Sequence, residues 1–337
     1  MRNAIFAFLI AFAVSLASGK LLLPFLHKLK FGQQVRSDGP KTHLAKQGTP
    51  TMGGMIFYAG AIAALLLLCT TFNGAWVFIT ISLVLTLGFG LLGFLDDYIK
   101  IVKKRSLGLR AYQKLIGQFG LAVIVAVWAY REQLIGSALI IPWLNVSLEL
   151  GWLYIPFTVL VIVGTVNAVN LMDGLDGLAG SAMFLDSIAF CVISGILGFA
   201  AAAAGDVMLG AELSSMTVFC GALSGGILAF LCYNRYPAHV FMGDTGSMGL
   251  GGALAAMGVV TRGQLLIPVI GVMFVVTAVS VILQVGSYKL RNKKRIFLMA
   301  PIHHHFELKG YSETSIVSAY SLITAIACVL LLLGFTN

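Results

Sequence analysis

The chain has 337 residues, of which 59% are hydrophobic and only 10% are charged, and its mean hydropathy is +0.95. This composition excludes an ordinary globular domain and predicts a polytopic membrane protein. The five cysteines lie in or beside apolar runs, so we expect small buried residues, and neither a disulfide framework nor a metal site.

Runs of about 20 apolar residues, the length that crosses a bilayer, predict ten transmembrane helices. They cover residues 4–26, 54–72, 75–95, 115–130, 153–169, 178–199, 214–231, 247–260, 265–288 and 314–335. The fold class is therefore an all-α integral membrane protein, with one polytopic domain over residues 1–337. The first run continues past Lys20 to Leu26, which favours an uncleaved anchor over a signal peptide. Between the fourth and fifth runs, residues 131–153 could lie on the membrane as a small hairpin.

Basic residues decide the predicted orientation. Of the 22 Lys and Arg residues, all but Arg2, Lys20, Arg131 and Arg262 lie in the odd-numbered connections between the runs. The positive-inside rule places these connections in the cytoplasm and both termini outside. The eighth run is short, but without it the basic cluster 289–295 would lie outside, so we expect a short or tilted helix. The motifs below occur in the same odd-numbered connections, which places the predicted active site on the cytoplasmic face.

The first connection contains a Thr-Pro-Thr turn with glycines on both sides, at residues 48–54. Such a turn could direct backbone N–H groups and hydroxyls toward an anion. The alternative is that Thr51 caps the helix that follows. Lys46, just before the turn, could contact a phosphate or belong to the solvated basic surface.

Asp96 and Asp97 stand at the end of the third apolar run, near the expected depth of a lipid phosphate. Adjacent acids point in different directions on a helix, so one is expected to bind while the other supports it. A metal that joins carboxylates to phosphate oxygens, or a carboxylate that acts as a base, would explain their position. The alternative is a helix cap with an ion pair to Lys100 or Lys104. The basic run that continues to Lys114 follows from topology and can also hold anionic lipid headgroups.

The fifth connection, residues 167–180, places Asn167, Asn170, Asp173 and Asp176 three residues apart, so at helical spacing they share roughly one face. Two glycines within the motif loosen the helix and let the backbone approach a ligand. Acids are costly at a membrane boundary, which makes function the default interpretation and a polar capping loop the alternative. The amides and carboxylates suit a uracil edge and a ribose as well as a metal, and the spacing does not decide between them.

In the seventh connection, Asp244 precedes the glycine-rich eighth run, whose first N–H groups suit a phosphate. A carboxylate beside a bound phosphate implies a cation between the two, because they would otherwise repel each other. Phe241 could stack on a base, and the alternative for a lone aromatic residue here is anchoring at the membrane interface.

The ninth connection holds three consecutive histidines, His303, His304 and His305. Consecutive histidines diverge and no cysteine accompanies them, so zinc binding is disfavoured. At neutral pH they can donate hydrogen bonds to phosphate or carboxylate without a permanent charge. We therefore favour anion or substrate binding, with a metal or a role in topology alone as alternatives.

Separate acidic sites and phosphate-suited loops at one membrane face fit phosphoryl transfer, in which Mg²⁺ is held by a few carboxylates and by substrate oxygens. On these motifs the sequence resembles the phospho-N-acetylmuramoyl-pentapeptide transferase family, or translocase I, within the polyprenyl-phosphate N-acetylhexosamine-1-phosphate transferase superfamily. The resemblance rests on residues 49–54, 96–100, 167–176, 243–244 and 301–307.

The resemblance implies transfer of phospho-MurNAc-pentapeptide from UDP-MurNAc-pentapeptide to undecaprenyl phosphate, which gives lipid I and UMP. This is the first membrane step of peptidoglycan synthesis, in the bacterial cytoplasmic (inner) membrane. The resemblance also implies Mg²⁺ as cofactor, a homodimer, no nucleic-acid partner, and a uridine site that nucleoside antibiotics occupy.

Residue roles follow from the same resemblance. Asp244 would be the metal ligand, Asp97 with Asp96 would activate the lipid phosphate, and Asp173 would support catalysis. The implied substrate-binding residues are Lys46, Thr51, Lys100, Lys114, Asn170, Asp176, Asn234, Phe241, Gly243, Ser247, His303, His304 and His305. Among these, Asp176, Asn234 and Phe241 would shape the uridine pocket, the three lysines would meet phosphates, and the histidines would meet the sugar-peptide end.

Three alternatives remain at the level of sequence. A polyprenyl-phosphate GlcNAc-1-phosphate transferase is the nearest, and the histidine triplet followed by Phe306 and Glu307 argues against it. A secondary transporter would need paired acids near the bilayer centre, and only Asp186 is predicted to lie that deep. A non-enzymatic lipid-binding scaffold would leave the acids replaceable.

Overall fold

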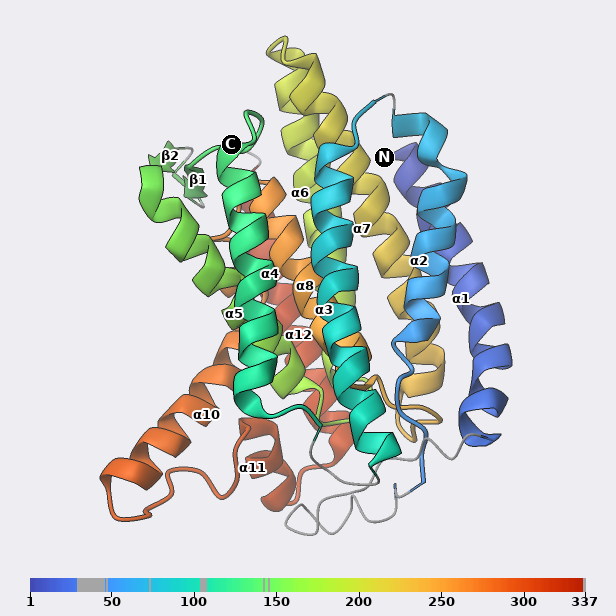
Figure 1. Cartoon of the computed structure of the whole chain (residues 1–337), viewed down its shortest axis with the longest axis vertical. Coiled ribbons are helices and arrows are strands. Elements are labelled where there is room, and N and C mark those ends of the chain that lie inside the picture. Colours follow the sequence, from blue (N-terminus) through green and yellow to red (C-terminus); the bar gives the residue numbers. More distant parts are fainter. Residues whose placement is uncertain are drawn as a thin grey trace.

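The computed structural model describes residues 1–28, 46, 48–72, 74–103, 108–141, 143–144 and 146–335. The chain forms a bundle of long helices, and both termini lie at the same end of it (Figure 1). In the described part of the chain, eight helices are long and apolar enough to cross a membrane. They are α1 (Arg2–Lys28), α3 (Val77–Val102), α4 (Ala111–Arg131), α5 (Tyr154–Met172), α6 (Leu178–Ala203), α7 (Val207–Asn234), α10 (Val272–Leu290) and α12 (Glu313–Leu333). A mostly helical, multi-pass membrane protein is confirmed.

The two remaining predicted runs also hold helices, but these are less extended or less apolar. The second run contains α2 (Met55–Leu67) and the short 3-10 helix η2 (Cys69–Phe72), and the eighth contains α8 (Gly243–Val260). The ninth run is not continuous, because α9 (Ile267–Ile270) is separated from α10 at Gly271. A final short helix, α11 (Ile302–Leu308), carries the histidine triplet and lies with α10 at the end of the bundle opposite the termini (Figure 1).

The predicted hairpin is present at the end of the bundle that holds the termini. Strands β1 (Ala138–Ile141) and β2 (Val146–Glu149) pair antiparallel, with Ala138 opposite Glu149. The short 3-10 helix η3 (Gly151–Leu153) then leads into α5. Arg262, after α8, fixes the hairpin: its carbonyl accepts from the Ile140 N–H at 2.8 Å and its guanidinium donates to the Leu134 carbonyl at 3.0 Å. This structural role explains why Arg262 lies outside the predicted cytoplasmic connections, where most basic residues are found.

Helix α8 lies at the centre of the bundle and is buried from Thr245 to Val260. Because α3, α5 and α6 pack around it, this helix does not need the hydropathy of a lipid-facing span. Its small residues let backbones approach closely, as is common between helices in membranes. A Cβ added at Gly252 of α8 would meet the Leu85 carbonyl, and one added at Gly93 of α3 would collide with the Asp244 carbonyl. Close packing through glycine therefore holds the end of α3 against the start of α8.

The first turn of α3 is capped from another helix. Glu212, fully buried in α7, accepts hydrogen bonds from the N–H groups of Val77 at 3.0 Å and Phe78 at 2.9 Å. These N–H groups have no partner within α3, and a carboxylate at a helix N-terminus also complements the helix dipole. The predicted run 214–231 missed this residue because α7 begins earlier, at Val207.

Replacing Glu212 with Gln should therefore destabilise the protein. The Gln amide offers one acceptor oxygen for two buried N–H donors, and an unsatisfied buried donor costs about 1–3 kcal/mol. We expect a lower unfolding temperature in a thermal-shift measurement on detergent-solubilised protein. The same substitution at Glu149, on the exposed strand β2, should leave the unfolding temperature unchanged. Equal unfolding temperatures for the two variants would contradict a capping role for Glu212.

Candidate active site

Three aspartates from two helices meet at the end of the bundle opposite the termini. Asp96 and Asp97 are in the last two turns of α3, and Asp244 is in the first turn of α8. One carboxylate oxygen from each residue lies within 4.8 Å of those of the other two. The adjacent acids were expected to point in different directions on the helix, but the structure brings one oxygen of each into a single group with Asp244. We call Asp96, Asp97 and Asp244 the acidic cluster.

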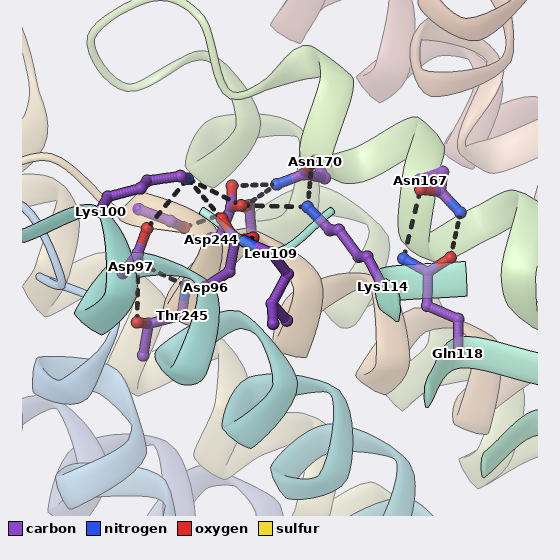
Figure 2. A network of polar contacts seen from close by, with 12 residues as sticks. Asp96, Asp97, Lys100, Leu109, Lys114, Gln118, Asn167, Asn170, Asp244 and Thr245 are labelled. Atoms are coloured by element: carbon purple, nitrogen blue, oxygen red, sulfur yellow. Dashed lines mark hydrogen bonds and ion pairs between the residues drawn. The ribbon is translucent and has the colours of Figure 1, made fainter. Parts of the chain in front are cut away.

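Two lysines surround the acidic cluster (Figure 2). The Lys100 Nζ lies 2.7 Å from Asp96 Oδ2, 3.4 Å from Asp97 Oδ1 and 3.0 Å from Asp244 Oδ2. The Lys114 Nζ, on α4, lies 3.0 Å from the same Asp244 oxygen. The ion pair to Lys100, named above as part of the alternative to a functional role, is thus present, while Lys104 lies outside the described residues. Three carboxylates and two ammonium groups leave a formal excess of one negative charge, so the site can accept further positive charge.

Neutral donors orient the carboxylates (Figure 2). The N–H and hydroxyl of Thr245 both donate to Asp97 Oδ2, at 2.9 and 2.8 Å. The Leu109 N–H donates to Asp96 Oδ1 at 2.8 Å, and the Asn170 amide donates to Asp244 Oδ1 at 2.7 Å. The same amide is 2.8 Å from the Ser247 hydroxyl oxygen. These hydrogen bonds fix the direction in which the remaining carboxylate oxygens point.

The motif of the fifth connection does not form one helical face. Helix α5 ends at Met172, and Gly177 adopts a left-handed backbone conformation (φ +79°) before α6 starts. The expectation of a shared face was therefore wrong beyond the end of α5. Asn167 pairs with Gln118 of α4 through two side-chain hydrogen bonds of 2.8 and 3.3 Å, while Asn170 reaches the acidic cluster.

Asp173 lies at the C-cap of α5, beside the acidic cluster but outside the helix. Burial, together with the negative charges of Asp244 and Asp97, raises the pKa of the Asp173 carboxyl well above its usual range. The protonated form is therefore favoured to higher pH than for an exposed aspartate, and in that form the group can donate a hydrogen bond.

Asp176 belongs to a second polar group at the same end of the bundle. Its Oδ1 lies 2.7 Å from Lys46 Nζ, and its Oδ2 accepts from the Ala238 N–H at 2.9 Å. Lys46 also pairs with Glu313, a residue that the sequence did not single out. Burial acts to lower the pKa of Lys46, but the hydrogen bonds and charges of Asp176 and Glu313 raise it above the usual value. Lys46 is therefore charged, and in this structure it contacts carboxylates.

Of the remaining predicted uridine-pocket residues, Asn234 lies beside this group, since it contacts the residue after Asp176. Asn234 is buried, and its amide bridges two loops: its oxygen accepts from the Gly177 N–H at 3.0 Å, and its nitrogen donates to the Val240 carbonyl at 2.9 Å. Phe241 is half-buried, two residues before α8 begins at Gly243. Asn234 thus holds the 177 and 240 segments together at the ends of α6 and α7.

The glycine-flanked turn of the first connection pairs with the segment before α8. The N–H groups of Gly53 and Gly54 donate to the carbonyls of Phe241 at 2.9 Å and Met242 at 3.2 Å. They are therefore not directed at an anion, and the helix that follows has Gly54, not Thr51, at its N-cap. The interpretation of Thr51 as the helix cap was therefore wrong, and the N–H groups of Gly53 and Gly54 serve close packing instead of an anion site. Thr51 instead faces Gly243, where an added Cβ would meet Thr51 Oγ1 at 2.6 Å and Asp97 Oδ2 at 2.5 Å.

The three histidines lie within α11, and the rings of His303 and His304 are in edge contact with their centroids 4.3 Å apart, so the expected divergence does not hold for this pair. His303 is fully buried, and a Cβ added at Gly174 would collide with its ring, so α11 packs on the fifth connection. His304 Nδ1 lies 2.6 Å from the Glu307 carboxylate, and His305 Nδ1 accepts from the Leu298 N–H at 3.1 Å.

Within the described residues, the acidic cluster is the one group of acids, histidines or cysteines close enough to hold a metal. The cavity of about 390 Å³ near Arg2 and Thr71 contains none of the predicted site residues.

Comparison with known proteins decides the family. Residues 78–262 match the family model described as glycosyl transferase family 4. The chain is 47% identical over 327 residues to the phospho-N-acetylmuramoyl-pentapeptide-transferase of Thermoanaerobacter sp. (strain X514), with 97% of each chain covered. It is 45% identical to the enzyme of that name from Clostridium kluyveri over the full length of both chains, and 47% identical to that of Heliobacterium modesticaldum over 98% of each.

This chain belongs to the phospho-N-acetylmuramoyl-pentapeptide-transferase family. The part that matches the family model includes the acidic cluster, Lys100 and Lys114. The histidine triplet lies beyond it, in the part covered by the full-length relatives. The regions that match the family therefore contain all the site residues described above.

Proposed function

We propose that this chain transfers phospho-MurNAc-pentapeptide from UDP-MurNAc-pentapeptide to undecaprenyl phosphate, with release of UMP and formation of lipid I. The observation that carries the proposal is the acidic cluster with Lys100 and Lys114 at one end of a membrane bundle. Two substrates with negatively charged phosphates must approach each other there, and the enzyme's main task is to position and neutralise them. The identity of at least 45% to full-length relatives that carry this enzyme's name supports the same reaction.

The donor set of the acidic cluster fits Mg²⁺. This ion prefers carboxylate, phosphate and water oxygens, and the site has one negative charge in excess of its two lysines. Asp244 would hold the ion together with Asp96 and Asp97. When bound, Mg²⁺ would supply positive charge that stabilises the phosphate oxygens during transfer.

The acceptor phosphate needs little help to become a nucleophile. A phosphate monoester has a second pKa of about 6, so at neutral pH it already carries most of its negative charge. We therefore assign Asp97, with Asp96, to the placing of the acceptor phosphate beside the donor and not to removal of a proton. Lys100 and Lys114 would offset the phosphate charges, Asp173 would donate a hydrogen bond at the reacting end, and Ser247 and Gly243 would shape the donor side.

The other predicted residues surround this centre. Asp176, Asn234 and Phe241 would form the uridine pocket, with Lys46 and Thr51 near the diphosphate. His304 and His305 would face the sugar-peptide end, and the buried His303 would support them from the side of the fifth connection. With the basic connections in the cytoplasm, the site would open on the inner face of the bacterial inner membrane and both termini would lie outside. We propose ten spans, with α2 and α8 as the two short ones, in one polytopic domain that functions as a homodimer.

The transfer reaction tests the proposal directly. Purified protein with Mg²⁺, undecaprenyl phosphate and UDP-MurNAc-pentapeptide should release UMP, and UDP-GlcNAc in place of the donor should release none. Because one phosphoanhydride replaces another, labelled UMP should also exchange into UDP-MurNAc-pentapeptide when lipid I is supplied. Chelation of divalent ions should stop both reactions, and added Mg²⁺ should restore them. Absence of UMP release by the wild-type protein would refute the proposal.

The surroundings of Asp186, the one acid predicted to lie deep in the membrane, argue against a secondary transporter. Asp186 is fully buried in α6, and its Oδ1 accepts from the Cys328 thiol at 3.6 Å. A thiol partner does not provide the paired ion-binding acids that a secondary transporter would need. Substrate uptake into liposomes without UMP release would still be the result that supports transport.

A further inference from the structure

Glu313, the first residue of α12, connects two segments that are distant in the sequence. Its Oε1 accepts a hydrogen bond from Lys46 Nζ at 2.6 Å and another from the backbone N–H of Asp176 at 2.6 Å. We propose that Glu313 is a positioning residue for the nucleoside-diphosphate end of the donor substrate. It fixes the Lys46 side chain and the Asp176 backbone in the positions from which they bind. This inference rests on the proposed function and adds to it a residue on which donor affinity depends.

The contacts of Glu313 are shielded and charge-assisted. Its side chain is 11% exposed, that of Lys46 is 17% exposed and that of Asp176 is 2% exposed. Hydrogen bonds to an ionised carboxylate are shorter and stronger than those between neutral groups. Lys46 is held between two carboxylates and lies 5.8 Å from the centre of the Tyr236 ring. Its ammonium group is therefore confined to one place before any substrate binds.

The Glu313 side chain is not needed as a cap for its own helix. Ser312 performs that task, because its hydroxyl oxygen accepts from the Ser315 N–H at 3.2 Å. The partners of Glu313 are instead 267 and 137 positions away in the sequence. In the described part of the chain, its hydrogen bonds join it to Lys46 and Asp176, which are proposed to bind the donor, and not to the acidic cluster. Loss of Glu313 should therefore weaken binding of the donor nucleotide and leave binding of the acceptor lipid unchanged.

Two variants separate the contacts of Glu313. In Glu313→Gln the amide oxygen can still accept from the Asp176 N–H, but the charge that holds Lys46 is lost. In Glu313→Met both contacts are lost at similar side-chain length. In full-length protein we expect the KM for UDP-MurNAc-pentapeptide to rise about tenfold in Glu313→Gln, which corresponds to about 1.4 kcal/mol, and further in Glu313→Met. The KM for undecaprenyl phosphate should stay within about twofold of wild type in both.

Ser312→Ala is the matched control, because it removes the helix cap one position away and leaves the contacts of Glu313 in place. It should lower the unfolding temperature and change neither KM. The double variant Lys46→Met/Glu313→Met should bind the donor only slightly more weakly than Lys46→Met alone, since contacting residues are not additive.

Two results would overturn the role of Glu313. One is an active Glu313→Met protein with an unchanged KM for the donor. The other is an equal rise in both KM values together with a lower unfolding temperature, which would indicate a purely structural residue. Failure of the wild-type protein to release UMP would refute the proposed function itself, so the two failures are distinguishable.

Discussion

Replacing Asp244 with Asn is expected to reduce the rate of UMP release about 1000-fold, the upper end of the loss caused by removing one preorganised electrostatic group from an active site. Asp244 is the residue on which the site converges: Lys100, Lys114 and Asn170 all contact its carboxylate. The amide of Asn has no charge to hold a divalent cation, and it leaves two lysines facing each other with one carboxylate fewer between them. The rate of UMP release under saturating substrates measures the effect.

A second aspartate provides the matched control for this substitution. Asp206 caps α7 at the end of the bundle that holds the termini, where its Oδ1 accepts from the Leu209 N–H at 3.1 Å. Asp206→Asn changes the same charge in the same protein, far from the acidic cluster, and should retain the wild-type rate. An Asp244→Asn protein with more than about a tenth of the wild-type rate would show that the acidic cluster is not the catalytic centre.

The residues of the acidic cluster could be predicted from the sequence because acidic residues are rare in the apolar segments of a membrane protein. An acid at a membrane boundary is costly, so Asp96, Asp97 and Asp244 stand out in the sequence against their apolar surroundings. Charge asymmetry then places their connections on one face of the membrane. The contact between α3 and α8 could not be derived in this way. It depends on Gly93 and Gly252, and a glycine in a sequence does not tell which backbone will approach it.

Two other features were misread or missed for a similar reason. The glycines at 53 and 54 fit both an anion-binding turn and a close approach of two segments, and only the position of residues 241–242 decides for the second. Glu313 resembles an ordinary acid in the first turn of a helix, where the helix dipole favours it. Its partners Lys46 and Asp176 come from other connections, so no local sequence pattern predicts that Glu313 contacts them.

The Gly93→Ala variant should retain its helices but lose most of its activity. The added methyl group would collide with the Asp244 carbonyl, and backbone cannot move aside as a flexible side chain can. The start of α8 must then shift away from α3, which separates Asp244 from Asp96 and Asp97. A displacement of about 1 Å in an active site can cost about 100-fold in rate, and overpacking costs about 1–3 kcal/mol in stability. We expect a rate of UMP release at least about 100-fold lower, with unchanged helical circular dichroism.

Gly120→Ala is the control that isolates this contact from the general effect of alanine in a helix. Gly120 lies within α4, and a Cβ there would meet no atom of the described chain within 4 Å. Alanine is favoured over glycine in a helix by about 1 kcal/mol, so this variant should be as stable as wild type or more so, at full activity. Full activity in Gly93→Ala as well would mean that the acidic cluster does not depend on the close packing of α3 against α8. Because that packing is what joins carboxylates from distant parts of the chain, it is the structural condition for the proposed reaction.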